Sequence, residues 1–423
     1  MAATATQNGL SRLKYRLLTG QDATLLIWGD STGNSRDNAG RWPQKIAASF
    51  AAAFPAHTIL LQNWNTVSTT AYDGASTIQS GSGSATLRII NMSVSGSVPH
   101  YAMAQIWDAA IGSVRPDALI LNHGINQLST GDPTGEAFIG TMMAAIEQFW
   151  SYWPDCPVAA MVQNPNRDDT SYDKLAAYWP RIARVLGISL IDIWSVFQAA
   201  GKPSAWYVDA THPSEPTGNQ KWANAIWTHF TGAIAFPGDF ARPALLHRSR
   251  RNLLVNGDFR TWTTTTAAPD GWTALGTVAF AKDTAVVADP ALGYSVKMTG
   301  SGSAQTGIKQ SLTSTARALC AGKTIFASAR INKDNQTSVG TVGLIQLVIN
   351  STAAGNVYYQ TRSYALKQNG FAWWALGPVQ VPADVIDINL RLYHDQATTP
   401  TTAYAASFDQ ACLVVGDRIG AAR

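Results

Sequence analysis

A serine that could act as a nucleophile follows the first strongly apolar run of the chain, in the turn Gly29-Asp30-Ser31. The run itself, residues 24–28, predicts a buried strand that ends just before this turn. Open α/β sheets bind their ligands at the carboxyl ends of their strands, so Ser31 would stand where a substrate arrives. A serine hydroxyl is a weak nucleophile that needs a neighbouring base. An ordinary turn, in which Asp30 or Ser31 caps the following helix, is the competing interpretation.

A candidate base lies far along the chain, in the loop Asp209-Ala210-Thr211-His212-Pro213. At this spacing the Asp209 carboxylate can accept a hydrogen bond from the imidazole Nδ1 of His212, which leaves Nε2 free to take a proton from a serine. The same spacing also arises by chance in loops that precede helices. The pair therefore predicts a catalytic base only in combination with the serine.

Two further turns supply candidate hydrogen-bond donors for a developing oxyanion. The segment 91–96 follows an apolar run and ends in the backbone N–H of Gly96, and the segment 122–126 follows another and ends in the side-chain amide of Asn126. A tetrahedral acyl-transfer intermediate needs such fixed donors, and the loss of one costs about 3 kcal/mol of transition-state stabilisation. Taken alone, each residue is equally well explained by the geometry of a turn at a strand end.

The elements between these motifs alternate in type over the first 230 or so residues. Short apolar runs predict buried strands at 24–28, 118–121, 158–162 and 188–193, and helical spacing recurs at 41–54, 100–113, 135–152, 172–186 and 217–232. This alternation is typical of a doubly wound α/β sheet. Two more apolar runs, 57–64 and 86–90, predict one further sheet strand and one inserted strand or hairpin. The pattern does not decide which is which.

With these four motifs in order at successive strand ends, residues 22–232 resemble the SGNH (GDSL-type) hydrolase family. The matching segments are Gly29-Asp30-Ser31, Asn91-x-Ser93-x-Ser95-Gly96, Gly124-x-Asn126 and Asp209-x-x-His212-Pro213. The resemblance implies a flavodoxin-like three-layer α/β/α fold with a catalytic triad of Ser31, His212 and Asp209. It also implies an oxyanion hole formed by the N–H groups of Ser31 and Gly96 and the amide of Asn126.

Two neighbours of these motifs leave alternatives open. The family's third motif usually reads Gly-x-Asn-Asp, whereas Gln127 follows Asn126 here. The expected role of Asn126 as an oxyanion donor does not depend on residue 127, but the hydrogen bonds that support Asn126 do. His123 is an alternative base, and a structural or site-lining histidine is its other interpretation.

The pattern changes near residue 235, and we predict a catalytic domain at 1–238, a linker at 239–251 and a second domain at 252–423. Short segments rich in Thr, Val, Tyr and Trp, with one short helical piece near 312–321, predict an all-β sandwich there. The ends of the segment 251–416 resemble jelly rolls of the carbohydrate-binding-module type. That resemblance implies sugar binding by exposed aromatic rings, for which packing in the core is the alternative role. The candidates are Trp262, Trp373, Trp374 and Tyr393.

Composition excludes several classes of protein. Only 14% of the 423 residues are charged and the formal net charge is +4, which argues against a nucleic-acid partner. No apolar stretch is long enough to span a membrane, and the first 21 residues lack an apolar signal core. The three cysteines show no metal-ligand spacing, although Cys320 and Cys412 would pair in an oxidising compartment. A calcium site on Asp258 or Asp409 is the one metal site that the jelly-roll resemblance suggests, and no metal or organic cofactor is expected for catalysis.

Together these observations predict a serine esterase, and the appended sandwich favours a carbohydrate esterase or deacetylase that acts on acylated polysaccharide. The alternative is a lipase-like or polyester-cleaving enzyme, which would use the same mechanism on a different ester substrate. A phage tail or adhesin component, with the hydrolase domain as an accessory, is a third interpretation and would predict a homo-oligomer such as a trimer. A secreted or virion-associated location is favoured, although no signal peptide is visible in this chain.

Overall fold

The computed structural model describes residues 8–37, 40–103, 106–127, 135–233, 252–285, 294–300, 306–333, 343–362, 371–394 and 404–416. Its contacts divide the chain into two compact units. The first comprises Met1–Pro99, Ile106–Leu128 and Ile146–Leu245, and the second comprises His100–Gln105, Ser129–Ala145 and Leu246–Arg423. The predicted linker at 239–251 lies outside the described residues, so the exact domain boundaries stay a prediction.

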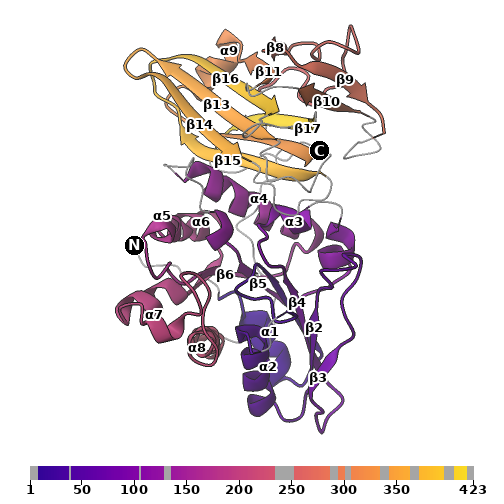
Figure 1. Cartoon of the computed structure of the whole chain (residues 1–423), viewed down its shortest axis with the longest axis vertical. Coiled ribbons are helices and arrows are strands. Elements are labelled where there is room, and N and C mark those ends of the chain that lie inside the picture. Colours follow the sequence, from indigo (N-terminus) through magenta and orange to yellow (C-terminus); the bar gives the residue numbers. More distant parts are fainter. Residues whose placement is uncertain are drawn as a thin grey trace. The chain divides into compact units, whose positions relative to one another are not determined.

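The first unit is built on a seven-stranded sheet with the order β3-β2-β4-β1-β5-β6-β7 (Figure 1). Its strands are β1 (Ala23–Gly29), β2 (Thr58–Asn63), β3 (Ser76–Gln79), β4 (Thr86–Ser93), β5 (Ala118–Asn122), β6 (Val158–Val162) and β7 (Ser189–Asp192). All neighbours are parallel except β3, which pairs antiparallel with β2. The parallel strands therefore end at one shared edge, where the turns after them can meet.

The strand order settles which apolar run is the inserted one. The set β4-β1-β5-β6-β7 has the flavodoxin-like order 2-1-3-4-5, in which the second strand lies beside the first. The run 86–90 is thus the second strand of the doubly wound sheet, and the run 57–64 forms β2, which extends the sheet beyond β4 together with β3. The α/β fold expected from the sequence is confirmed.

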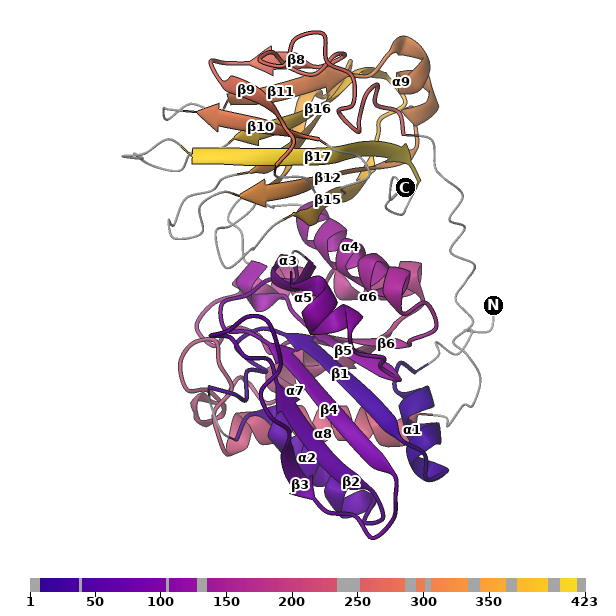
Figure 2. The same ribbon diagram turned by 90° about the vertical axis from the view of Figure 1, so that its right-hand side faces the viewer.

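Helices cover both faces of this sheet (Figures 1 and 2). They are α1 (Ser11–Leu18), α2 (Trp42–Ala53), α5 (Ser171–Ala176), α6 (Trp179–Leu186), α7 (Ile193–Ala199) and α8 (Thr217–Gly232). Two further helices belong wholly or partly to the second unit, namely α3 (His100–Met103) and α4 (Glu136–Tyr152). One core joins the inner faces of α1, α2, α7 and α8 to the sheet, and it includes Phe50, Trp222 and Ile226. The other face carries α5 and α6.

Two predicted helices are divided in the structure. The pattern at 172–186 forms α5 and α6, because Pro180 stands at the first turn of α6, a position that a proline accepts only at a helix start. The pattern at 100–113 forms α3 and a π-helical turn, η1 (Asp108–Gly112). The strands and the remaining helices start and end close to the predicted residues.

The second unit contains two five-stranded antiparallel sheets, β15-β12-β17-β10-β9 and β14-β13-β16-β11-β8. Their strands are β8 (Thr273–Leu275), β9 (Ala279–Asp283), β10 (Ser295–Gly300), β11 (Thr306–Ser311), β12 (Thr324–Lys333), β13 (Leu344–Ser351), β14 (Gly355–Arg362), β15 (Ala372–Gln380), β16 (Val385–His394) and β17 (Tyr404–Val415), with one helix, α9 (Ser314–Cys320). Alternate residues such as Ile345, Leu347 and Ile349 face one apolar core. The expected all-β domain and its short helix are confirmed.

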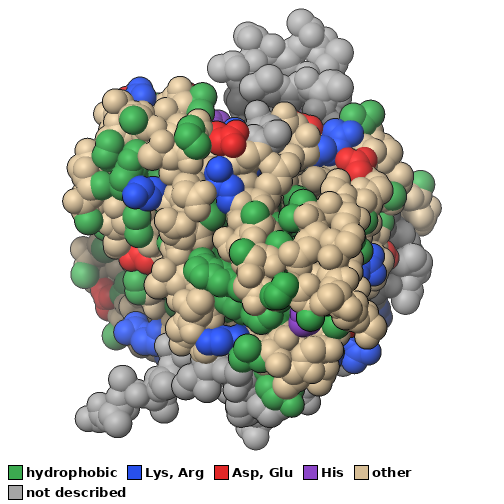
Figure 3. All heavy atoms as spheres, turned by 90° about the horizontal axis from the view of Figure 1, so that it is seen from below, with side chains coloured by type: hydrophobic (Ala, Val, Ile, Leu, Met, Phe, Trp, Pro, Cys, Tyr) green, Lys and Arg blue, Asp and Glu red, His purple; other side chains and the backbone are tan. Residues whose placement is uncertain are grey.

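Cys320 and Cys412 are both buried as free thiols, as is Cys156, so the structure does not contain the Cys320–Cys412 disulfide that an oxidising compartment would allow. Burial raises the pKa of the Cys320 thiol to about 11 and that of the Cys412 thiol to about 12. Within the described part of the chain, no helix is long and apolar enough to cross a membrane. Figure 3 shows basic and acidic side chains dispersed over the face that it draws.

Candidate active site

The serine turn is held by close packing against two neighbouring strands. The N–H of Asp30 donates to the carbonyl of Asn122 at the end of β5, over 3.2 Å, and the N–H of Gly33 donates to the carbonyl of Asp30 over 3.1 Å. A Cβ atom on Gly29 would lie 2.7 Å from the Ser93 Oγ and 3.0 Å from the Asn122 Nδ2. Glycine is thus required at the end of β1, because the turn that carries Ser31 passes between the ends of β4 and β5.

The three side chains that the sequence predicts as a triad form one hydrogen-bonded line. The Ser31 Oγ lies 2.8 Å from the His212 Nε2, and the His212 Nδ1 lies 2.8 Å from the Asp209 Oδ2. This arrangement brings together residues from the turn after β1 and the loop before α8. With Nδ1–H donating to the carboxylate, the unprotonated Nε2 faces the serine hydroxyl, which is the tautomer that a general base needs.

The Asp209 carboxylate is held by more than the imidazole. Its Oδ1 accepts hydrogen bonds from the backbone N–H groups of Thr211 and His212, each over 2.7 Å. Partial burial raises its pKa, but these two bonds, the bond to the His212 ring and the charge of His212 outweigh that effect and leave the pKa of Asp209 below its usual value. A carboxylate that stays ionised fixes the imidazole and stabilises its protonated form.

The three predicted oxyanion donors belong to this same unit, and two come from loops after the neighbouring strands. Gly96 follows β4 with a φ of +70°, in the left-handed region that favours glycine. Asn126 lies in the 3-10 turn η2 (Ile125–Gln127) after β5, and its Nδ2 donates to the carbonyl of Ser97 over 3.0 Å. That bond uses one of the two amide hydrogens of Asn126 and connects the two loops.

A buried polar cluster beneath the serine turn was missed by sequence reasoning. The Gln163 Nε2, which follows β6, donates to the Asp30 Oδ2 over 2.8 Å and to the Asn122 Oδ1 over 2.9 Å, while its Oε1 accepts from the N–H of Ile125 over 2.7 Å. The hydroxyl and N–H of Thr32 donate to the other oxygen of Asp30. One glutamine therefore ties the serine turn to the Asn126 loop.

Asp30 is fully buried in this cluster. Burial raises the pKa of its carboxyl group, and the hydrogen bonds from Gln163 and Thr32 only partly offset that effect. Among the hydrogen bonds of the described residues, the Asp30 side chain makes none to a triad side chain, although the charge of His212 also acts to lower its pKa. Its place is under the turn, where it receives the hydrogen bonds that fix the backbone on both sides of Ser31.

The two alternatives left open by the sequence lie apart from the triad. His123 is buried, its ring packs edge-on against Trp28 with centroids 6.0 Å apart, and burial lowers its pKa to about 3. It is His212, and not His123, that contacts Ser31. The Gln127 Oε1 is buried and finds no hydrogen-bond donor among the residues that the structure describes.

The four aromatic residues proposed to bind sugar differ in exposure. Trp374 and Tyr393 are 3% and 6% exposed, so neither offers a ring face to a ligand. Trp262 is half-buried, packs against the sandwich core and donates from Nε1 to the carbonyl of Phe259 over 2.6 Å. Trp373 is half-buried beside its cross-strand neighbour Arg330, whose guanidinium carbon lies 5.8 Å from the ring centre.

The acidic residues suggested for calcium do not form a metal site in the described part of the chain. Asp258 pairs with Arg260, the residue that stands where a further acidic group would be expected, with 3.0 Å between Oδ2 and Nε. Asp409 is buried in β17. No group of three or more acidic, histidine or cysteine side chains able to hold a metal ion occurs among the residues described.

The structure thus places a serine, a histidine and an aspartate in one hydrogen-bonded line at the carboxyl edge of a doubly wound α/β sheet. Residues 27–220 match the model of the GDSL-like lipase/acylhydrolase family. This match supports a hydrolase of the acylhydrolase type, which agrees with the expected esterase at the level of reaction class.

Solved structures with a similar arrangement include a two-domain esterase, CEX, described as active on acetylated mannans (14% identity, 98% of this chain and 97% of that chain covered, TM-score 0.44). Another is a carbohydrate esterase of family 3 from Talaromyces cellulolyticus (15% identity, 49% and 96% covered, TM-score 0.37). A third is the family 22 carbohydrate-binding module of Clostridium thermocellum Xyn10B (14% identity, 38% and 96% covered, TM-score 0.29). No curated protein sequence matches the chain significantly.

Proposed function

We propose that the protein is a serine esterase that hydrolyses its substrate through a triad of Ser31, His212 and Asp209. The observation that supports this most directly is the distance of 2.8 Å between the Ser31 Oγ and the His212 Nε2. A serine hydroxyl is activated for acyl transfer by an adjacent base, and this contact supplies one.

In the first half of the reaction, the Ser31 hydroxyl attacks the ester carbonyl while the His212 Nε2 takes its proton. The imidazolium that forms is stabilised by the Asp209 carboxylate on Nδ1, and it then protonates the leaving alcohol. In the second half, His212 removes a proton from water, the resulting hydroxide attacks the acyl-enzyme, and Ser31 leaves with the proton returned from His212. The N–H groups of Ser31 and Gly96 and the Asn126 amide hold the oxyanion in both halves.

For the substrate, we propose an acylated polysaccharide, with acetyl as the acyl group. The support for this class is the attached β-sandwich, a kind of domain that commonly holds extended ligands, and the half-exposed ring of Trp373 on it. Aromatic rings suit sugar recognition because they offer an apolar face of sugar-like size.

The test is the release of acetate from acetylated polysaccharide and from a simple aryl acetate by the full chain. We expect Ser31→Ala to lower kcat by about five orders of magnitude or more and Asp209→Asn by about 10⁴-fold. Ser49→Ala is the matched control, since the Ser49 hydroxyl only donates to the carbonyl of Lys45 in α2. If Ser31→Ala released acetate as fast as the Ser49→Ala control, the triad proposal would be wrong. Faster cleavage of long-chain than of acetyl aryl esters would instead overturn the substrate class.

A further inference from the structure

A second polar network begins at Asn34, three residues after Ser31. This side chain is fully buried, and its four hydrogen-bonding positions are all occupied. The Oδ1 accepts from the backbone N–H groups of Arg36 and Asp37, over 3.2 and 3.3 Å. The Nδ2 donates to the Ser95 Oγ over 2.9 Å and to the Asp37 Oδ2 over 2.7 Å. Because backbone N–H groups can only donate, the amide orientation is fixed and Nδ2 must face Ser95.

Ser95 immediately precedes Gly96, so the peptide group between them carries the N–H that would serve the oxyanion hole. Val94 and Ser97 on either side of the turn are buried, whereas nothing lies within 4 Å of the position of a Cβ atom on Gly96 itself. Hydrogen bonds also hold the turn. Besides the Asn34–Ser95 bond, the N–H of Ser97 donates to the carbonyl of Val94 over 3.1 Å, and the Ser97 hydroxyl donates to the carbonyl of Gly29 over 3.3 Å. Of these, only the bond from Asn34 reaches the residue before Gly96.

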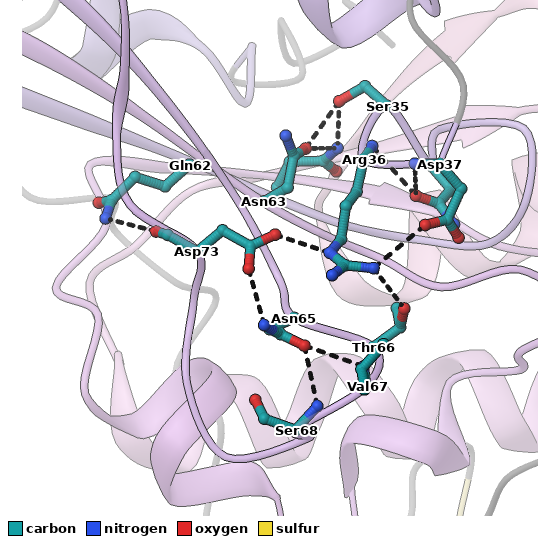
Figure 4. Close-up of polar contacts among 12 residues, drawn as sticks. Ser35, Arg36, Asp37, Gln62, Asn63, Asn65, Thr66, Val67, Ser68 and Asp73 are labelled. Carbon is teal, nitrogen blue, oxygen red and sulfur yellow. Dashed lines mark hydrogen bonds and ion pairs between the residues drawn. The ribbon is translucent and has the colours of Figure 1, made fainter.

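The other partner of Asn34, Asp37, is held in turn by the inserted part of the sheet (Figure 4). The Arg36 Nη1 donates to the Asp37 Oδ1 and to the Thr66 hydroxyl over 3.3 and 3.2 Å, and its Nε donates to the Asp73 Oδ2 over 2.6 Å. Asp73 also accepts from the Asn65 Nδ2 over 2.8 Å. The connection between β2 and β3 thereby fixes Asp37, and through Asp37 it fixes Asn34 in the serine turn.

We propose that Asn34 is a positioning residue that holds the Gly96 N–H toward the oxyanion through its bond to Ser95, with Asp37 and the β2–β3 connection fixing Asn34. The inference rests on the proposed esterase function. Asn34 touches neither the substrate nor the reacting atoms. Its effect is to limit the rotation of one peptide group, which matters because an oxyanion donor must lie within hydrogen-bond reach of the place where charge develops.

The main test exchanges the two side chains that share a hydrogen bond. Asn34→Asp places a second carboxylate against Asp37, and the repulsion between the two carboxylates moves residue 34 away from Ser95. We therefore expect kcat to fall about tenfold to hundredfold with little change in KM, a smaller loss than removal of an oxyanion donor would cause. In Asn34→Asp/Asp37→Asn, the new amide can donate to the new carboxylate, and the Ser95 hydroxyl can donate to it as well. We expect this double variant to recover kcat to within about threefold of the original chain, a coupling that a double-mutant cycle measures.

A thionoester substrate distinguishes misplacement of an oxyanion donor from a general loss of active-site structure. Its sulfur is a poor hydrogen-bond acceptor, so a misplaced oxyanion donor should slow the oxygen ester much more than the matching thionoester. We expect Asn34→Asp to lower the ratio of ester to thionoester rates about tenfold. The pH profile of kcat/KM should not move in Ser95→Ala, because that variant changes no charge near His212 and Asp209.

Ser95→Ala is the second variant. It removes the same bond from the other side and leaves the buried Asn34 in place, so it keeps the test valid if Asn34→Asp fails to fold. An unchanged rate ratio in both Ser95→Ala and a folded Asn34→Asp, or no recovery in the double variant, would overturn the inference. Failure of the esterase proposal would show itself separately, as full activity of Ser31→Ala.

Discussion

At the scale of single residues, the active-site unit uses the same side-chain types in opposite ways. Asp209 is half-exposed, receives two backbone hydrogen bonds and has a lowered pKa, whereas Asp30 is fully buried and has a raised pKa. His212 contacts Ser31, whereas burial lowers the pKa of His123 to about 3. The role of each side chain therefore follows from its burial and its contacts, which the residue type alone does not predict.

The buried His123 gives a prediction about acid stability. The unfolded chain takes up a proton at this residue below about pH 6.5, while the folded chain does so only near pH 3. Between these values the unfolded state binds more protons, so the free energy of unfolding falls as the pH falls, by up to about 1.4 kcal/mol per pH unit from this residue. We expect His123→Phe to flatten the decline in the urea midpoint measured from about pH 6 to about pH 4.

The comparison at about pH 8, where His123 is neutral in both states, is the control, because there the substitution changes only packing against Trp28. Equal slopes in the acid range for the variant and the original chain would contradict the assignment of a neutral, buried His123.

At the scale of elements, the sequence predicted the strand ends better than the buried polar cluster around Gln163 and Asp30 beneath the serine turn. Apolar runs are visible directly, so the motifs at Ser31, Gly96, Asn126 and His212 could be placed after strands or before a helix. Gln163 could not be found in this way. A lone glutamine after an apolar run carries no motif, and its importance comes only from strands that are adjacent in space. The same is true of Asn34, whose partner Ser95 lies 61 residues further along the chain.

The close approach of β1, β4 and β5 gives a prediction about Gly29. A methyl group there would lie 2.7 Å from the Ser93 Oγ and 3.0 Å from the Asn122 Nδ2, both below an ordinary contact. We expect Gly29→Ala to push the serine turn out of line and to lower kcat by about 100-fold, because small errors in placing a nucleophile are costly. Gly232→Ala, at the end of α8 where a Cβ atom meets nothing within 4 Å, is the matched control. Esterase kinetics of both purified variants decide the matter, and equal kcat values would show that the turn tolerates the methyl group.

At the scale of the whole molecule, the sequence separated two kinds of domain but could not sort the aromatic residues of the second. Trp373 and Trp374 are neighbours in β15, and successive residues of a strand face opposite sides. Trp374 faces the core, while Trp373 does not. Tyr393 is buried as well, although its hydroxyl accepts a hydrogen bond from Arg391. Residue type alone does not distinguish a ring that packs from a ring that binds.

The difference between Trp373 and the buried rings gives a prediction about which domain binds the polysaccharide. If the sandwich holds the polysaccharide, Trp373→Ala should raise KM for an acetylated polymer about fivefold, the equivalent of about 1 kcal/mol of lost ring contact. The kinetics on a small aryl acetate should stay the same, because that substrate needs only the residues around Ser31. The matched control is Tyr358→Ala, which removes an exposed ring from the opposite sheet and should change neither substrate. An increase in KM with Tyr358→Ala alone would place the glycan on the other sheet. Unchanged polymer kinetics in both variants would mean that these rings do not bind the substrate, and would leave the catalytic domain to recognise it alone.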